Sequence, residues 1–253
     1  MSAVFIRTMK FIDRIRQAIS RYDGTHNFTC DNCGKEVFDG KRLCEDCREE
    51  LPYNNRAVCP FCGRRVKEEG ACLDCKQKPL GVRKARSLWI HEGDAAKLVR
   101  LYKSGNKYLF RLFAEELAPI VGREFTDADA LTFVPMTEKA QKKRGYNQTY
   151  LIAEDLSKRT GKELLNVAEK RRDTADQREL TRAEREKNME GVFRVTDRKA
   201  VKGKRILIVD DTLTTGATAS ALAEVLKRAG AAEVYLITAT SVEKKNPFGI
   251  ITE

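Results

Sequence analysis

The sequence predicts an α/β protein with a doubly wound parallel sheet, preceded by a small cysteine-rich module. From residue 85 onward, short apolar segments alternate with segments of helical periodicity, as in parallel strands joined by helices. All eight cysteines lie between Cys30 and Cys75. The 253 residues suffice for one large core plus such a module. We therefore expect a basic amphipathic segment (residues 1–27), a double zinc ribbon (28–78) and an α/β domain (79–253).

The N-terminal segment has apolar residues at helical spacing, namely Phe5, Ile12, Ile15 and Ile19, with basic residues around them. A helix packed on the protein's own body is the simpler interpretation, and peripheral contact with a membrane surface is the alternative. The segment has no signal-peptide pattern, and the longest apolar runs of the chain are only a few residues. We expect a cytoplasmic protein without a transmembrane segment.

The cysteines form four Cys-x2-Cys pairs, and their spacing favours metal over disulfides. Four such pairs can supply two tetrahedral thiolate sites, so we expect about two zinc ions. Sequential ribbons would join the first two pairs and the last two; a cross-braced fold would join first with third and second with fourth. We favour the sequential arrangement and a structural or recognition role. The expected ligands are Cys30, Cys33, Cys44, Cys47, Cys59, Cys62, Cys72 and Cys75.

Behind the module, Pro79 and Gly81 mark a boundary. We expect strands at residues 85–90, 131–134, 164–168, 192–195, 205–209 and 233–240. Helices are expected at residues 94–103, 107–121, 147–159 and 216–228, with Asp94 as an N-cap and Gly161 as a C-cap. Residues 170–190 are mostly charged and are expected to form a loop.

The most informative stretch follows the apolar strand that ends at Val209. Two adjacent carboxylates, Asp210 and Asp211, are followed by a threonine-rich turn with Gly216 and then by a helix. Ligands of open α/β sheets bind at the carboxyl ends of strands. A helix N-terminus offers free N–H groups to a phosphate, and glycine allows close backbone approach. Carboxylates repel phosphate but accept hydrogen bonds from hydroxyls, so the combination predicts a sugar phosphate ligand.

This stretch resembles the signature of type I phosphoribosyltransferases, which bind 5-phosphoribosyl-1-pyrophosphate (PRPP). The resemblance implies that Asp210 and Asp211 hold the ribose hydroxyls. It also implies that the following loop holds the 5-phosphate, and that Mg²⁺ accompanies PRPP. The loop residues concerned are Thr212, Leu213, Thr214, Thr215, Gly216 and Thr218.

The same resemblance implies two further segments. A pyrophosphate loop would comprise Met136, Thr137, Glu138 and Lys139, followed by the basic stretch of residues 142–148. Glu138 departs from the otherwise basic character of this loop. A flexible lid would lie at residues 170–188, where Arg172 is the candidate contact to pyrophosphate.

The Cys-x-x-Cys pairs, the Lys-Arg-Gly-Tyr-Asn-Gln stretch at residues 143–148 and the PRPP loop occur in this order in ComF (ComFC-like) proteins, which this chain resembles. The resemblance implies a PRPP-binding protein of natural competence, which takes part in uptake of single-stranded DNA with a helicase-like ATPase partner. The alternatives are an active phosphoribosyltransferase acting on an unidentified base or amine, and a PRPP-sensing regulator. Whether the chain is an enzyme stays open at this point.

Charge and aromatic residues bear on the nucleic-acid hypothesis. The net charge is +11, and the segment from Lys76 to Arg111 contains ten basic residues and only two acidic ones. Such a bias suits a phosphate-bearing partner, although a solvated basic surface is an equally good interpretation. Trp89, Tyr102, Tyr108 and Phe110 lie within or beside this stretch and could stack on bases. For Trp89 we expect a core position instead.

Overall fold

The structure is a computed structural model that describes residues 28–38, 40–172 and 191–243. It divides into two compact units, Met1–Glu50 and Leu51–Glu253. The first cysteine quartet lies in the first unit, whereas the second quartet lies in the second unit together with the sheet. The division therefore falls inside the cysteine-rich module and not after residue 78, where the composition of the sequence changes.

The first unit is a small ribbon around Cys30, Cys33, Cys44 and Cys47. An antiparallel bridge joins Thr29 to Glu36, and helix α2 (Glu45–Glu50) carries the last cysteine. Its interior also holds an ion pair between Arg42 and Asp31, whose side chains are 6% and 3% exposed. Such a short segment has little apolar core, so its fold depends on a bound metal.

The second unit is built on a five-stranded parallel sheet in the order β1-β7-β6-β2-β3. The strands are β1 (Lys84–Ile90), β2 (Ala130–Phe133), β3 (Glu163–Leu164), β6 (Arg205–Leu213) and β7 (Glu233–Ser241). All four neighbouring pairs are parallel, which confirms the expected sheet. The central position of β6 explains its apolar sequence, because Ile206, Leu207, Ile208 and Val209 are all fully buried.

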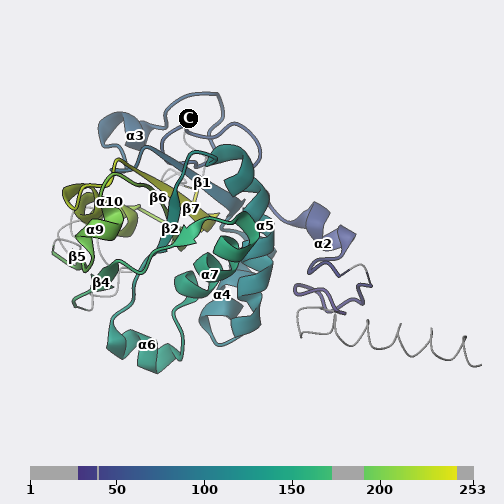
Figure 1. Cartoon of the computed structure of the whole chain (residues 1–253). Coiled ribbons are helices and arrows are strands. Elements are labelled where there is room, and N and C mark those ends of the chain that lie inside the picture. Colours follow the sequence, from purple (N-terminus) through teal and green to yellow (C-terminus); the bar gives the residue numbers. More distant parts are fainter. Residues whose placement is uncertain (1–27, 39, 173–190, 244–253) are drawn as a thin grey trace, which may run out of the picture. The chain divides into compact units, whose positions relative to one another are not determined.

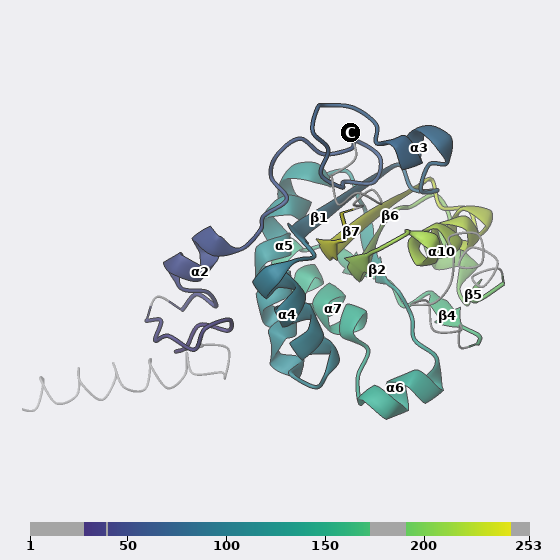
Figure 2. The same ribbon diagram turned by 180° about the vertical axis from the view of Figure 1, so that it is seen from behind.

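Helices cover both faces of this sheet, as Figures 1 and 2 show. Helices α4 (Gly93–Lys103), α5 (Phe110–Glu124) and α7 (Gln148–Thr160) lie on one face, and α10 (Ala217–Arg228) lies on the other. A short 3-10 turn, η1 (Lys107–Leu109), precedes α5. The remaining helices are α3 (Leu73–Gln77), α6 (Glu138–Arg144) and α9 (Arg198–Val201). The doubly wound architecture is thereby confirmed.

The expected strand at residues 164–168 is wrong, because the chain forms two shorter strands there. After β3 it leaves the central sheet, and β4 (Ala168–Lys170) pairs antiparallel with β5 (Phe193–Val195) in a separate two-stranded sheet. Leu165 and Val167 between them are buried in the main core. Their apolar character comes from this packing and not from a continuous strand.

Two local expectations about helices also need correction. The basic stretch before residue 145 is not a loop, because α6 occupies it with Thr137 as its N-cap. The N-cap of α4 is Glu92, which makes no side-chain cap, and Asp94 lies in the first turn instead. In contrast, Asn147 caps α7 and Gly161 ends it in the left-handed conformation, as expected for the end of that helix.

Candidate functional site

The threonine-rich loop lies where β6 passes into α10. Strand β6 continues through both acids to Leu213, four residues beyond the predicted end at residue 209. Gly216 then adopts a φ of +82° directly before the first residue of α10, a conformation that L-residues avoid. Thr214 is exposed, and Thr212, Thr215 and Thr218 are partly exposed. The loop is therefore partly open to solvent directly before the start of α10.

Not every side chain of this loop can contact a ligand. Leu213 is 2% exposed and belongs to the hydrophobic core on the α10 face. Its contribution to a ligand is therefore restricted to its backbone. The Thr215 hydroxyl accepts a hydrogen bond from the Ala217 amide at 3.3 Å, which stabilises the first turn of α10.

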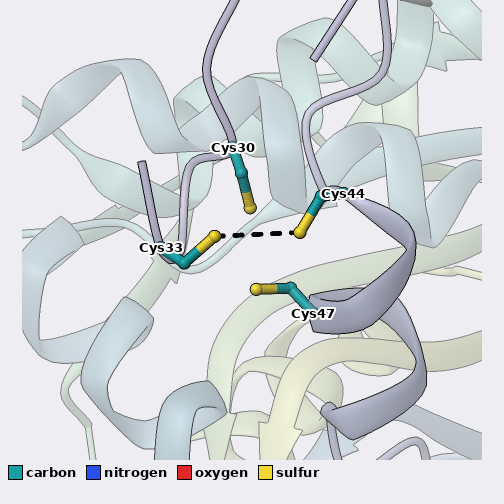
Figure 3. A group of neighbouring side chains, drawn as sticks. All are labelled: Cys30, Cys33, Cys44 and Cys47. Carbon is teal, nitrogen blue, oxygen red and sulfur yellow. Dashed lines mark hydrogen bonds between the residues drawn. The ribbon is translucent and has the colours of Figure 1, made fainter. Parts of the chain in front are cut away.

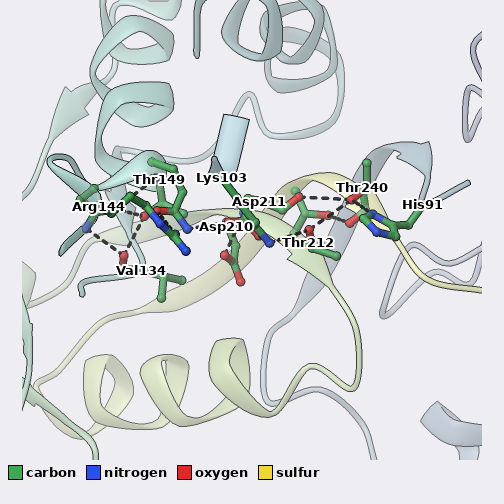
Figure 4. Close-up of polar contacts among 12 residues, drawn as sticks. His91, Lys103, Val134, Arg144, Thr149, Asp210, Asp211, Thr212 and Thr240 are labelled. Atoms are coloured by element: carbon green, nitrogen blue, oxygen red, sulfur yellow. Dashed lines mark hydrogen bonds and ion pairs between the residues drawn. The ribbon is translucent and has the colours of Figure 1, made fainter. Parts of the chain in front are cut away.

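Asp211 is the most constrained residue of the site, with 6% exposure. Its Oδ1 lies 2.8 Å from Nζ of Lys103, at the end of α4, and its Oδ2 accepts a hydrogen bond of 2.8 Å from Nε2 of Gln148, at the start of α7. Figure 4 shows Lys103 beside Asp211. Burial alone would raise the pKa of Asp211, but the positive charge of Lys103 and these hydrogen bonds hold the pKa below its usual value.

Asp210 behaves in the opposite way. Burial, followed by the charge of Asp211, raises the pKa of Asp210 to about 7. Its Oδ1 accepts a hydrogen bond of 2.8 Å from the Asp211 amide. Two adjacent carboxylates resist double ionisation, and Lys103 determines which one carries the charge. At neutral pH the pair therefore combines a charged Asp211 with a partly protonated Asp210.

The stretch at residues 143–148 holds this acid pair in place through hydrogen bonds. Nη1 of Arg144 donates to Oε1 of Gln148 at 2.6 Å, which orients the amide toward Asp211. The Tyr102 hydroxyl donates to the Gln148 carbonyl at 2.7 Å, and Tyr146 donates to the Tyr102 carbonyl. This segment therefore positions Asp211, in addition to any contact that it makes with a ligand.

Asn147 and Thr149 connect this segment to the end of β2 by hydrogen bonds. Nδ2 of Asn147 and the hydroxyl of Thr149 both donate to the Val134 carbonyl, at 3.2 and 2.7 Å. Val134 directly follows β2, the neighbour of β6 in the sheet. The end of β2 is thereby linked to the carboxylates at the end of β6.

A second polar chain leads from the acid pair to β1. The Thr240 hydroxyl donates to Oγ1 of Thr212 at 3.3 Å and lies 2.9 Å from Nδ1 of His91. Burial, and then the charges of Lys103 and Arg100, lower the pKa of His91. The sequence alone suggested no role for His91 or Lys103, and it placed Gln148 at the end of the basic stretch of residues 142–148 without predicting its contact with Asp211. A usable signal exists for His91, since it directly follows β1 and the ends of parallel strands share one edge.

The four residues proposed for pyrophosphate lie at the end of β2 and the start of α6. Glu138 and Lys139 are exposed, whereas the Thr137 hydroxyl accepts a hydrogen bond from the Ala140 amide. Met136 lines an open pocket of about 480 Å³ together with Phe133, Asn147 and Tyr150. Arg172 is exposed at the end of a described segment, and the rest of the predicted lid, residues 173–190, lies outside the described residues. The assignment of these residues to a ligand stays a prediction.

The eight cysteines form two groups of four, Cys30/Cys33/Cys44/Cys47 and Cys59/Cys62/Cys72/Cys75, in which all sulfurs lie within 4.8 Å of one another. This is the sequential arrangement, and Figure 3 shows the first group. Tetrahedral zinc with bonds of about 2.3 Å requires sulfurs separated by about 3.8 Å. The Sγ distances of 3.7 Å for Cys33 to Cys44 and 3.6 Å for Cys62 to Cys72 fit zinc.

Two of the aromatic residues considered for stacking on bases are core residues. Trp89 and Tyr102 are fully buried, whereas Tyr108 is 50% exposed. Trp89 packs against Tyr53 and Phe113 at ring-centroid distances of 6.0 and 5.9 Å. The core position expected for Trp89 is confirmed. Within the described ranges, no helix combines the length and the apolar character needed to cross a bilayer.

Comparison with known proteins agrees with this two-part organisation. The family model of the double zinc ribbon domain matches residues 27–76, and that of the phosphoribosyl transferase domain matches residues 147–247. The chain therefore carries both domains in the order that the sequence predicts.

Three curated relatives are similar over most of the chain. Competence protein ComFC of Bacillus subtilis is 23% identical over 76% of this chain and 80% of its own length. DNA utilization protein YhgH of Salmonella typhi is 28% identical over 77% of this chain and 94% of its own. Competence protein F of Haemophilus influenzae is 24% identical over 83% and 95%, respectively. The resemblance to ComF proteins is confirmed.

Proposed function

We propose that this ComF-like chain, in which a double zinc ribbon precedes a phosphoribosyl transferase domain, binds PRPP and acts in the handling of incoming DNA. The second part of the proposal comes from relatives that are named for competence and DNA utilization. The observation that carries the first part is Asp211. It is a buried carboxylate at the carboxyl end of the central strand, held in place by Lys103 and Gln148.

The proposed binding mode follows the charge distribution of the site. The ribose hydroxyls would donate to Asp211, which keeps unused lone pairs although Lys103 and Gln148 occupy both of its oxygens. The 5-phosphate would lie at Gly216 and the start of α10, where amides and the helix dipole favour an anion. The pyrophosphate would lie toward the end of β2, the neighbouring strand.

Magnesium is part of this proposal, because a diphosphate commonly binds as its Mg²⁺ complex. Asp210 is the residue whose protonation we expect to change when Mg²⁺ binds. A nearby cation favours the carboxylate form of a group whose pKa is about 7, so Mg²⁺–PRPP would convert Asp210 to its charged state. Proton release on binding at pH 6.5 to 7 would accompany this change.

The test is a titration of wild type and two aspartate variants with PRPP and Mg²⁺, followed by calorimetry and phosphorus NMR. We expect Asp211→Ala to lose PRPP binding by at least about tenfold and to stay folded, because it removes a charge-assisted contact. The matched control is Asp129→Asn. Asp129 pairs with Arg205 at the opposite end of β6, so its loss leaves the ligand edge intact. Normal PRPP affinity in folded Asp211→Ala would refute the site.

The same NMR experiment separates binding from turnover. Shifted PRPP signals that persist would support a binding protein, and decay to free pyrophosphate that depends on an added base or amine would support a transferase. For a transferase, the site would act by electrostatic stabilisation of an oxocarbenium-like ribose and of the leaving pyrophosphate, without a covalent nucleophile.

The role with DNA is tested separately. We expect binding of single-stranded oligonucleotides that weakens steeply with salt, because the chain has a net charge of +11. Fluorescence anisotropy at several salt concentrations measures this, with and without PRPP. Affinity that is absent even at low salt would contradict direct DNA binding and would favour action through a protein partner, such as a helicase-like ATPase.

A further inference from the structure

The two zinc ribbons repeat one local architecture. In each, a Cys-x2-Cys-Gly knuckle is followed by a basic residue, Lys35 in the first ribbon and Arg64 in the second. An equivalent backbone hydrogen bond closes each knuckle. The Cys30 amide donates to the Lys35 carbonyl at 2.7 Å, and the Cys59 amide donates to the Arg64 carbonyl at 2.8 Å. Each basic residue also reaches the aspartate of the second knuckle, Asp46 at 2.7 Å and Asp74 at 3.5 Å.

The surroundings of the two ribbons are very different. The Lys35 side chain is 62% exposed, and a Cβ atom added to Gly34 meets nothing within 4 Å. The Arg64 side chain is 6% exposed, and a Cβ atom at Gly63 would lie 2.4 Å from the carbonyl oxygen of Ala85 in β1. The second knuckle therefore packs directly against the edge strand of the sheet.

The second zinc site is also continuous with the core below α10. Cys59, Cys62 and Cys75 belong to the same buried cluster as Leu213 of β6 and Leu222 of α10. Leu80, just after the ribbon, contacts the start of α10, because a Cβ atom at Gly216 would lie 2.0 Å from its Cδ2. The ribbon thus supports the strand and the helix that flank the phosphate loop.

Arg64 makes the most direct link between zinc and the loop. Its Nη1 faces Asp74, which lies between the ligands Cys72 and Cys75, and its Nη2 donates to the backbone carbonyl of Thr214 in the middle of the loop. A donor behind this carbonyl fixes the orientation of the adjacent peptide units. Its buried positive charge also favours an anion on the other side of the loop.

We propose that Arg64 is a positioning residue for the phosphate loop, and that zinc at Cys59/Cys62/Cys72/Cys75 and PRPP stabilise each other. We expect no such coupling for the first zinc site, because the equivalent residue, Lys35, pairs with Asp46 within its own ribbon. The inference rests on the proposed PRPP binding. A bound metal would hold the four thiolates of the second ribbon together, so we expect loss of the second zinc to release Arg64 from Thr214. Because linkage is reciprocal, bound PRPP must then raise the affinity of that site for zinc.

The test compares Arg64→Met with Lys35→Met, which changes the equivalent residue of the other ribbon, in the full chain with both zincs bound. We expect Arg64→Met to bind PRPP about tenfold or more weakly, since it loses a charged hydrogen bond to the loop, and Lys35→Met to bind within about twofold of wild type. Arg64→Lys keeps the charge and should recover part of the affinity. Near-UV circular dichroism and metal content show whether each variant has kept its fold.

Two readouts do not depend on ligand affinity alone. In equilibrium competition with a colorimetric chelator, wild type should lose its zinc in two steps, and PRPP should shift one of them to higher chelator concentration. This shift should disappear in Arg64→Met and persist in Lys35→Met. Hydrogen exchange without ligand should be faster at the amides of residues 214–218 in Arg64→Met only.

The outcomes are separable. Wild type that binds PRPP while folded Arg64→Met binds it equally well, with unchanged exchange at the loop, would overturn the role of Arg64 and leave the proposed function standing. Wild type that fails to bind PRPP would refute the proposed function and the coupling to PRPP. In that case the hydrogen-exchange comparison still decides whether Arg64 positions the loop.

Discussion

Replacement of Lys103 by methionine tests the electrostatic account of the site most directly. The change keeps the aliphatic stem and removes the charge that lies 2.8 Å from Asp211, whose side chain is 9% exposed. Breaking a fully buried ion pair costs about 3–5 kcal/mol. Because the Lys103 side chain is 35% exposed, solvent screens part of this interaction. We expect a loss of about 1–3 kcal/mol at pH 8.

The loss should depend on pH in a defined direction. In wild type the pKa of Asp211 is lowered, so this group adds stability at all pH values above its unfolded pKa near 4. Without Lys103, burial raises the pKa of Asp211, and charging the group then costs stability as pH rises. The difference between wild type and Lys103→Met should therefore grow from pH 5.5 to pH 8.5.

The assay is urea denaturation of wild type, Lys103→Met and a control at three pH values. Lys97→Met on the same helix is the control, because Lys97 lies 3.8 Å from Asp94 at a site where both side chains are almost half exposed. We expect it to stay within about 0.5 kcal/mol of wild type. The double variant Lys103→Met/Asp211→Asn should recover most of the stability. A loss that does not vary with pH, or a double variant no more stable than Lys103→Met, would refute this reasoning.

Two further predictions follow from the acid pair and from the cysteine groups. Asp210→Asn should raise the free energy of unfolding by about 1–3 kcal/mol at pH 8 and have little effect near pH 4. With a folded-state pKa of about 7, Asp210 lowers stability progressively as pH rises from its unfolded pKa near 4 to about 7, and the penalty is complete above that. Denaturation at both pH values checks this, and unchanged stability at pH 8 would contradict it. Freshly purified reduced protein should contain about two zinc ions per chain, by ligand counting over the two groups of four sulfurs; elemental analysis that finds none would rule out the zinc sites.

Much of the fold could be predicted from the sequence, because the α/β pattern is local. The apolar run Ile206-Leu207-Ile208-Val209 is buried on both faces of the sheet, and such a strand shows in composition alone. The left-handed glycines Gly161 and Gly216 at helix boundaries are equally visible, since few other residues tolerate that conformation. The segment after β3 could not be predicted, because buried residues between two sheets have the same composition as a strand.

Part of the candidate site could also be predicted from the sequence, and part could not. Asp210 and Asp211 stand beside an apolar strand and a glycine-containing turn, so their environment is encoded within ten residues of chain. Lys103 and Gln148 meet Asp211 from 108 and 63 positions away in the sequence. No local pattern distinguishes Lys103 from other lysines on helices, and the motif that ends at Gln148 does not indicate its contact with Asp211.

The sequence by itself determined two arrangements of residues in this protein: thiolates spaced for zinc, and an acid pair joined to the turn that we propose binds a phosphate. Both are local, since a knuckle or a strand-to-helix turn brings its own ligands together. Only the tertiary structure decided that the second zinc ribbon packs against the sheet and reaches the loop after β6. This packing depends on the close approach of Gly63 to β1 and of Arg64 to Thr214, contacts between segments that are distant in the chain.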